Sequence, residues 1–240
     1  MVEFREEVYR QLEEKMDDYK DYADIPVIPE EDEVGFVAVR PSAVLSVKPV
    51  NDSIVSLPAD GIILRSAVAD RLYWAGQELK SFDKELQLEV VCGYWSPEVH
   101  QKLFDETRSS LAAEYGDEDE LLEATHRRIA VSDVAGHPTG GAVDVHILRD
   151  GVAVDAGTTI WDFAQDSFTF SPFISREAWQ NRQLLRRAMM VAGFAPYDGE
   201  WWHFSYGSKE WARFYNQPGA LYNQVAAMEV DRRKSTDILS

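Results

Sequence analysis

The sequence predicts an α+β fold, with a mainly antiparallel sheet and helices packed against it. Short apolar or alternating runs at 34–39, 86–94 and 142–148 are typical of core strands. Longer segments with apolar residues at helical spacing separate these runs. A turn signal at 149–151 (Arg-Asp-Gly) predicts a hairpin, which joins two strands in antiparallel order.

The chain of 240 residues divides into three predicted parts. Residues 1–33 are expected to form a polar helix over 3–22 and then an acidic linker that contains prolines. Residues 34–217 are expected to form a single domain, because this length and 45% hydrophobic content can supply one sizeable core. Residues 218–240 are expected to form a polar tail, which offers little to bury beyond Gly219.

The elements in the first half of the domain are predicted from boundary signals and from the spacing of apolar residues. Arg40-Pro41 ends the first strand, and Ser96-Pro97 begins a helix with serine as the N-cap and proline in the first turn. The expected order is a strand at 34–39, loop and short strands at 42–60, a helix from 62 to about 82, a strand at 86–94, a helix at 96–115 and a further helix ending near 129.

The second half alternates loops with shorter elements. Ser175 is a plausible N-cap for a helix that Gly193 stops. The loop before that helix is long, and long loops inside a compact domain are often functional. The expected order is a loop around His137, a strand at 142–148, a second hairpin strand at 152–154, a loop at 155–175, a helix at 176–191, a strand at 200–206 and a short helix at 208–215.

Composition excludes several classes of partner. Lys and Arg number 24 against 42 for Asp and Glu, a formal net charge of −18, so we expect neither nucleic acid nor an anionic membrane as a partner. The single cysteine, Cys92, allows no intramolecular disulfide and no cysteine-based zinc site, and it is expected to be a small buried hydrophobe. Without a signal-peptide pattern or a long apolar run, the expected location is cytoplasmic. The oligomeric state is left open.

His137 and Asp144 form the first half of a candidate metal site. His137 lies on a loop, and Gly140 and Gly141 let the chain turn sharply, so that the next strand returns beside it. Asp144 is expected in the middle of that strand between valines, where a buried charge is costly unless something pairs with it. A metal ion is the simplest such partner.

The stretch Glu200-Trp-Trp-His203 supplies the second half. With His203, two imidazoles and a carboxylate fill three corners of a tetrahedral zinc site and leave the fourth for water. Glu200 can then act as the general base. On a regular strand Glu200 and His203 point to opposite faces, so we expect a bend or bulge here. The alternative for this stretch alone is an edge strand with a capping histidine.

The remaining histidines and the paired tryptophans have simpler interpretations. His146 shares the face of Asp144 and is expected to support the site or the core, whereas His100 and His126 are expected to be structural or exposed. Trp201 and Trp202 are expected to pack the core beside the metal. The S-x-x-K match at 81–84, typical of penicillin-interacting serine enzymes, has no accompanying K-T-G and is attributed to chance.

The strings HPTGGAVD at 137–144 and EWWH at 200–203 resemble the D-alanyl-D-alanine dipeptidases, the vancomycin-resistance type of zinc metallopeptidase. The likeness extends to the segments 91–103, 155–163 and 181–194, and covers roughly residues 60–207. It implies that His137, Asp144 and His203 bind Zn²⁺, that Glu200 is the catalytic base, and that the substrate is a small peptide such as D-alanyl-D-alanine. It also implies substrate-binding roles for Tyr94 and Trp95, and for Asp162 as the partner of the substrate's ammonium group.

Two positions depart from the family pattern. Trp95 stands where the family has an arginine, and the loss of such a donor costs about 3 to 4 kcal/mol of transition-state stabilisation unless Arg40 or Arg65 replaces it. Ala135 stands where the family tends to have serine. Two alternatives therefore stay open: a zinc carboxypeptidase or amidase acting on longer peptidoglycan fragments, and a metal-binding regulatory protein without turnover. The retention of Glu200 argues against the second.

Overall fold

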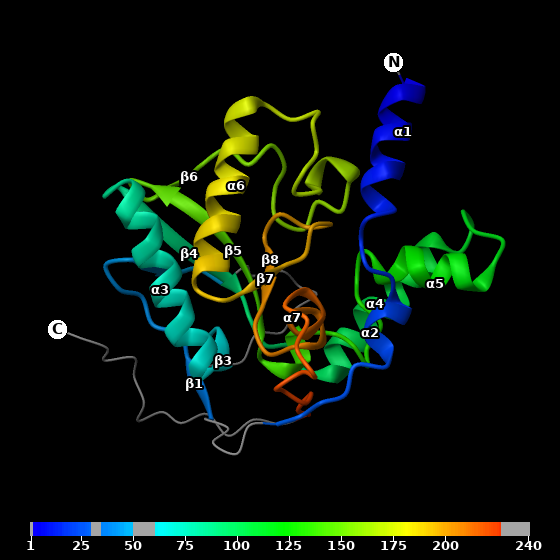
Figure 1. Cartoon of the computed structure of the whole chain (residues 1–240), viewed down its shortest axis with the longest axis horizontal. Helices are drawn as coiled ribbons and strands as arrows, with labels where there is room; N and C mark the ends of the chain where they lie inside the picture. The colour runs from blue at the N-terminus through cyan, green and yellow to red at the C-terminus, as the bar shows by residue number, and fades with distance from the viewer. Residues whose placement is uncertain (1, 30–34, 50–60, 227–240) are drawn as a thin grey trace.

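A central mixed sheet organises the chain, and the computed structural model describes residues 2–29, 35–49 and 61–226 (Figure 1). The strands of this sheet follow the order β2-β4-β5-β8-β7, and β6 pairs with β5. A separate two-stranded sheet pairs β1 with β3. The strands are β1 Phe36–Ala38, β2 Leu45–Val47, β3 Ile63–Arg65, β4 Leu86–Cys92, β5 Ala142–Arg149, β6 Val152–Ala153, β7 Ala195–Pro196 and β8 His203–Ser205.

The expectation of a mainly antiparallel sheet is wrong, because the sheet is mixed. β2 runs parallel to β4, with Leu45 opposite Leu88, whereas the other pairings in this sheet are antiparallel. The segment between β2 and β4 contains helix α3, Ser66–Phe82. Parallel neighbours need a crossover connection of this kind, and the sequence gives no direct sign of which strands it joins.

The predicted helix over 62–82 begins later than expected. Residues 63–65 form β3, which pairs antiparallel with β1, and the helix starts at Ser66. A short apolar run such as Ile62-Ile63-Leu64 fits a strand as well as a helix, so periodicity alone cannot place this boundary. The other helices of the domain are α4 Pro97–Leu111, α5 Glu118–His126, α6 Arg176–Val191 and α7 Lys209–Phe214.

The N-terminal segment forms two helices instead of the one predicted over 3–22. These are α1, Val2–Glu13, and α2, Tyr19–Ala23. Asp18 begins α2 with a capping box that it shares with Asp21, and this breaks the longer helix. α2 contacts α7, and Tyr9 of α1 is fully buried.

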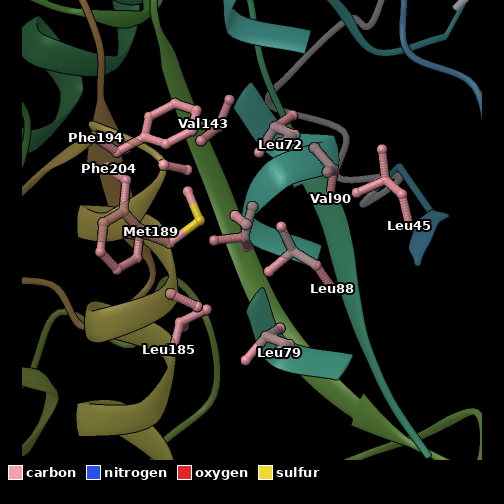
Figure 2. Packing of buried hydrophobic residues seen from close by; sticks show 14 of the residues in the cluster. Leu45, Leu72, Leu79, Leu88, Val90, Val143, Leu185, Met189, Phe194 and Phe204 are labelled. Atoms are coloured by element: carbon pink, nitrogen blue, oxygen red, sulfur yellow. The ribbon is translucent and has the colours of Figure 1, made fainter. Parts of the chain in front are cut away.

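The main core lies between the sheet and the pair α3 and α6, which pack against each other on one face (Figure 2). Along β5, Val143 and Val145 enter this core together with Leu88 and Val90 of β4. Because side chains alternate along a strand, Asp144 must face the opposite side of the sheet. The apolar periodicity of β5 therefore sets the position of the candidate site.

The segment after α7 is more buried than predicted. Ala220 forms a parallel bridge with Val27, and Tyr222 packs against the main core, so the expectation that little is buried beyond Gly219 is wrong for these residues. The acidic run at 30–33, Val34, residues 50–60 and the tail from 227 lie outside the described residues. Among the helices of the described ranges, none is long and apolar enough to cross a membrane.

Candidate metal centre and its pocket

Asp144 and His203 meet because they are direct partners across two strands. β5 and β8 pair antiparallel with Asp144 opposite His203, so both side chains point to the same face. Oδ1 of Asp144 lies 3.2 Å from Nδ1 of His203. The two strands therefore form a rigid base for two of the predicted ligands.

His137 reaches the same point from the loop before β5. It opens a 3₁₀ turn, His137–Thr139, and Gly140 ends that turn at φ +73°, a left-handed conformation that favours glycine. A Cβ at Gly140 would lie 2.3 Å from the ring of Phe36, so the position also has no room for a side chain. The chain can therefore reverse into β5 within a few residues of His137.

The tautomer of His137 follows from its backbone contact. Its Nδ1 lies 2.6 Å from the carbonyl oxygen of Gly93, which can only accept, so Nδ1 carries the proton. Nε2 is then the free nitrogen, and it lies 3.5 Å from Oδ1 of Asp144. Trp95 fixes the ring plane by stacking on it, with centroids 4.4 Å apart and planes 5° apart.

The spacing of the three groups fits a zinc ion. Ligand atoms of His137, Asp144 and His203 all lie within 4.8 Å of one another. Oδ1 of Asp144 lies 3.2 Å from Nδ1 of His203 and 3.5 Å from Nε2 of His137. The edge of a tetrahedron with metal–ligand bonds of about 2.0 Å is about 3.3 Å. Burial raises the pKa of Asp144, but the two histidines outweigh it and hold the pKa well below the usual range, so the carboxylate is ionised.

Trp161 supports Asp144 from the long loop after β6. Its indole N–H donates to Oδ2 of Asp144 at 2.9 Å, which leaves Oδ1 for the two imidazoles. The backbone of Trp161 has φ +65°, a strained conformation for a bulky residue. The sequence marked the loop as functional by its length but did not single out this residue.

Glu200 lies in a turn instead of the predicted strand. The strand expected at 200–206 begins only at His203, and a turn closes with the amide of His203 donating to the carbonyl of Glu200 at 3.2 Å. This turn is the expected bend, and it lets Glu200 line the same cavity as His203. Burial, helped by the neighbouring Asp144 and Glu210 and opposed by His203, raises the pKa of Glu200 to about 8. The carboxylate is thereby poised to accept a proton near neutral pH.

Glu210 is a site residue that the motifs did not reveal. Its Oε2 lies 3.3 Å from Nε2 of His203, on the side of the ring away from Asp144. It belongs to the first turn of α7, whose N-cap is Ser208. Its position seven residues after His203 depends on the turn between β8 and α7, and no short-range pattern in the sequence indicates that contact.

The three ligand-type residues and Glu200 line one cavity. Much of the wall is apolar or aromatic. The other lining residues are Trp95, His100, His126, Arg128, Ile129, Ala130, Gly136, Trp161, Phe163, Tyr197 and Glu210.

Arg128 is the one arginine or lysine among the residues that line this cavity. Arg65, considered above as a substitute for the missing family arginine, is buried elsewhere and donates to the carbonyls of Thr139 and Asn223. Arg40 is exposed and does not line the cavity. The structure therefore brings a different arginine to the site from the two that the sequence suggested.

Two of the predicted substrate-binding residues lie outside the cavity lining. Asp162 is exposed, and its carboxylate accepts a hydrogen bond from the amide of Ala164. Tyr94 is buried beside the small sheet and donates to the carbonyl of Val225. Trp95 does line the cavity, and its indole N–H donates to the buried thiol of Cys92.

The other histidines lie around the site without joining the ligand group. His100 contacts the carbonyl of Ala130 through Nε2, and His126 accepts from the amide of Val131; both are buried. His146 is not among the residues that line the cavity, and its Nε2 lies 2.7 Å from Oε2 of Glu89 on β4. Trp201 and Trp202 are buried in the main core, as the sequence indicated.

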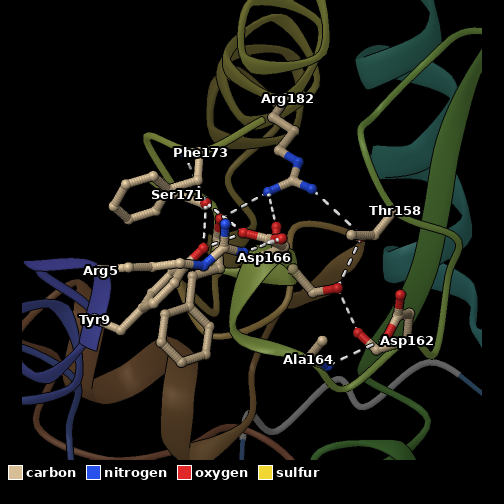
Figure 3. Close-up of polar contacts among 11 residues, drawn as sticks. Arg5, Tyr9, Thr158, Asp162, Ala164, Asp166, Ser171, Phe173 and Arg182 are labelled. Carbon is tan, nitrogen blue, oxygen red and sulfur yellow. Dashed lines mark hydrogen bonds and ion pairs between the residues drawn. The ribbon is translucent and has the colours of Figure 1, made fainter. Parts of the chain in front are cut away.

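Arg182 organises the long loop that carries Trp161 (Figure 3). This buried side chain of α6 donates to the carbonyls of Ala156, Asp166 and Phe168. From the other side, Tyr9 and Arg5 of α1 both contact the carboxylate of Asp166. The loop is therefore held between α6 and the N-terminal helix, although it lacks long secondary structure.

A family model and a curated relative both match this chain, and both point to the same family. Residues 114–224 match the model of peptidase family M15, described as D-ala-D-ala dipeptidase. A D-alanyl-D-alanine dipeptidase of Synechocystis sp. is 30% identical in an alignment 190 residues long, and the alignment covers 68% of this chain and 77% of that protein.

Two solved structures have weaker similarity. One is a mutant of the vancomycin-resistance D,D-pentapeptidase VanY from a VanB-type cassette, in complex with Zn(II): 19% identity, TM-score 0.40, covering 75% of this chain and 96% of that one. The other is VanYB in complex with D-alanine-D-alanine: 20% identity, TM-score 0.40, covering 75% of this chain and 94% of that one.

Proposed function

Since the chain belongs to peptidase family M15, the metallopeptidase family of the D-alanyl-D-alanine dipeptidases, we propose that it is a zinc-dependent dipeptidase that hydrolyses D-alanyl-D-alanine. His137, Asp144 and His203 would hold the ion, and Glu200 would be the general base. The observation that carries the proposal is the convergence of all four side chains on one cavity.

The chemistry divides between the ion and the chain. Zinc, when bound, polarises the scissile carbonyl and lowers the pKa of a water molecule toward about 7. Glu200 takes a proton from the attacking water and delivers it to the leaving amine as the peptide bond breaks. The raised pKa of Glu200 suits both steps, because the same carboxyl group must accept and then release a proton at neutral pH.

Arg128 is proposed to bind the anionic end of the substrate. A dipeptide carries a carboxylate, and Arg128 is the one arginine or lysine among the residues that line this cavity, so it is the basic side chain placed to pair with that group. Arg128 lines this cavity and also the neighbouring one that shares Glu200 with it. An arginine–carboxylate contact is directional and charge-assisted, so it can orient the scissile bond toward Glu200.

The apolar walls suit small side chains. Trp95, Ile129 and Ala130 offer surfaces against which an alanine methyl group can pack without an unpaired polar atom. The role of Asp162 stays a prediction, since its carboxylate lies outside this lining.

Hydrolysis of a peptide panel tests the proposal. The zinc-loaded protein is incubated with D-alanyl-D-alanine, with L-alanyl-L-alanine and with a peptidoglycan pentapeptide that ends in D-alanyl-D-alanine, and released amine is measured. We expect the free D,D-dipeptide to have the highest kcat/KM. A higher kcat/KM for the pentapeptide would show that the protein is a carboxypeptidase and not a dipeptidase. Zinc binding without turnover of any peptide would contradict the proposal.

A further inference from the structure

We infer that Glu210 is a positioning residue that holds His203 with Nε2–H toward its own carboxylate and Nδ1 toward the ion. The inference rests on the metal site of the proposed function, but it concerns which nitrogen binds and how tightly, not which peptide is cleaved. The outer nitrogen of His203 then faces a carboxylate, that of Glu210, whereas the outer nitrogen of His137 faces the neutral carbonyl of Gly93.

The two nitrogens of His203 face two different carboxylates. Nδ1 lies 3.2 Å from Oδ1 of Asp144, and Nε2 lies 3.3 Å from Oε2 of Glu210. Asp144 is one of the three residues whose ligand atoms lie close together, with His137 and His203. Glu210 is not in that group. The Nδ1 edge of the ring therefore faces the ligand group, and the Nε2 edge faces away from it.

Glu210 is held in place by its surroundings. The hydroxyl of Ser208 caps α7 by accepting from the amide of Trp211, and this directs the first turn of the helix at the site. On the other side lies the loop of His137, where a Cβ built on Gly136 would come within 3.5 Å of Oε2 of Glu210. The side chain of Glu210 is only 16% exposed, so few other orientations are open to it.

Both ring nitrogens of His203 face a carboxylate, but Asp144 would share the ion with Nδ1, whereas Glu210 lies outside the ligand group with Oε2 3.3 Å from Nε2. A carboxylate oxygen accepts hydrogen bonds, so the nitrogen that faces Glu210 carries the proton. Nδ1 then supplies the lone pair for the metal.

The consequence is a difference between the two histidine ligands. His137 donates its outer N–H to the neutral carbonyl of Gly93, whereas His203 donates to a carboxylate. A carboxylate behind an imidazole raises its basicity, and loss of such an outer partner typically weakens metal affinity or activity by about 10- to 100-fold. Glu210 is therefore expected to tighten zinc binding through His203.

Zinc affinity and the tautomer of His203 test this inference. The variants are Glu210→Ala and Glu210→Gln, and the matched control is Glu177→Gln. Glu177 and Glu210 both stand two residues after a serine N-cap, but Glu177 is exposed. The control therefore removes the same charge from the same helical position, away from the site. The zinc Kd is measured by competition with a chromogenic chelator, and the ring nitrogens of zinc-loaded wild-type protein are observed by long-range ¹H–¹⁵N NMR.

We expect a 10- to 100-fold weaker zinc Kd for Glu210→Ala, a smaller loss for Glu210→Gln, whose amide oxygen can still accept, and no change for Glu177→Gln. The NMR spectrum should show His203 protonated at Nε2 and metallated at Nδ1. A zinc Kd that is unchanged in Glu210→Ala, or metallation at Nε2, would overturn the inference. The NMR measurement decides the matter even if a variant fails to fold, and neither readout depends on which peptide, if any, is hydrolysed.

Discussion

The indole N–H of Trp161 donates to Oδ2 of Asp144 across 2.9 Å, from a backbone held at φ +65°. The two carboxylate oxygens of Asp144 therefore have different partners. Oδ2 accepts the hydrogen bond from Trp161, and Oδ1 faces both histidines. The strained backbone persists because the loop is anchored on both sides of Trp161. The long loop therefore contacts the candidate metal ligand Asp144 through the side chain of Trp161.

Trp161→Phe should weaken zinc binding while leaving the fold intact. The phenyl ring keeps much of the apolar surface but cannot donate to Asp144, so we expect a zinc Kd about 10- to 100-fold weaker in chelator competition. Trp179→Phe on the outer side of α6 is the matched control, since that side chain is 41% exposed. Equal zinc affinity in the two variants would show that the contact with Asp144 is unimportant.

Much of the site follows from the sequence, because its central residues come from short, local patterns. The alternation of β5 places Asp144 opposite the core valines, and the glycines after His137 return the chain beside it. The contacts of Trp161, Arg128 and Glu210 join parts of the chain whose approach depends on tertiary packing, so no periodicity marks them. The parallel pairing of β2 with β4 was missed for the same reason, since register between distant strands leaves little local trace.

Arg182→Met should destabilise the protein without touching the metal ligands. The variant leaves the carbonyls of Ala156, Asp166 and Phe168 without their common donor; Ala156 is buried, and the other two residues are partly buried. An unsatisfied buried carbonyl costs about 1 to 3 kcal/mol, so we expect the free energy of unfolding in urea to fall by about 2 to 3 kcal/mol. Arg187→Met on the same helix, at a side chain that is 64% exposed, should change it by less than about 0.5 kcal/mol. Similar values for both variants would refute the bracing role of Arg182.

Arg128→Met should raise KM for D-alanyl-D-alanine by about 10- to 100-fold, the loss expected for one charge-assisted contact. Zinc content should not change, because Arg128 is not among the ligand residues. The C-terminal amide of the same dipeptide supplies the control: wild-type protein should bind it poorly, and the variant should bind the acid and the amide alike. A variant that still prefers the acid would exclude Arg128 as the carboxylate partner.

The attachment of α1 should weaken in acid. Burial raises the pKa of Asp166, but hydrogen bonds from Tyr9 and Arg5 outweigh it, and the net pKa is lowered. A carboxyl group with a lowered folded-state pKa stabilises the fold above its unfolded pKa of about 3.9, and this contribution is lost as the pH falls through the folded value.

The comparison of wild-type protein with Asp166→Asn by urea unfolding measures this contribution. The wild type should be more stable by about 1 kcal/mol at pH 7, since the carboxylate is partly exposed. The difference should shrink below pH 4 as the wild-type carboxyl group becomes neutral. A difference that stays constant down to pH 3 would mean that the charge of Asp166 does not hold α1.

The most direct test of the account compares zinc-loaded wild-type protein with Glu200→Gln, measuring zinc stoichiometry and release of D-alanine from D-alanyl-D-alanine on the same samples. The glutamine keeps the size of the side chain but cannot take a proton, so it should bind one zinc per chain and hydrolyse the dipeptide at least about 100-fold more slowly. Hydrolysis by Glu200→Gln at the wild-type rate, or intact dipeptide after incubation with zinc-bound wild-type protein, would contradict the account.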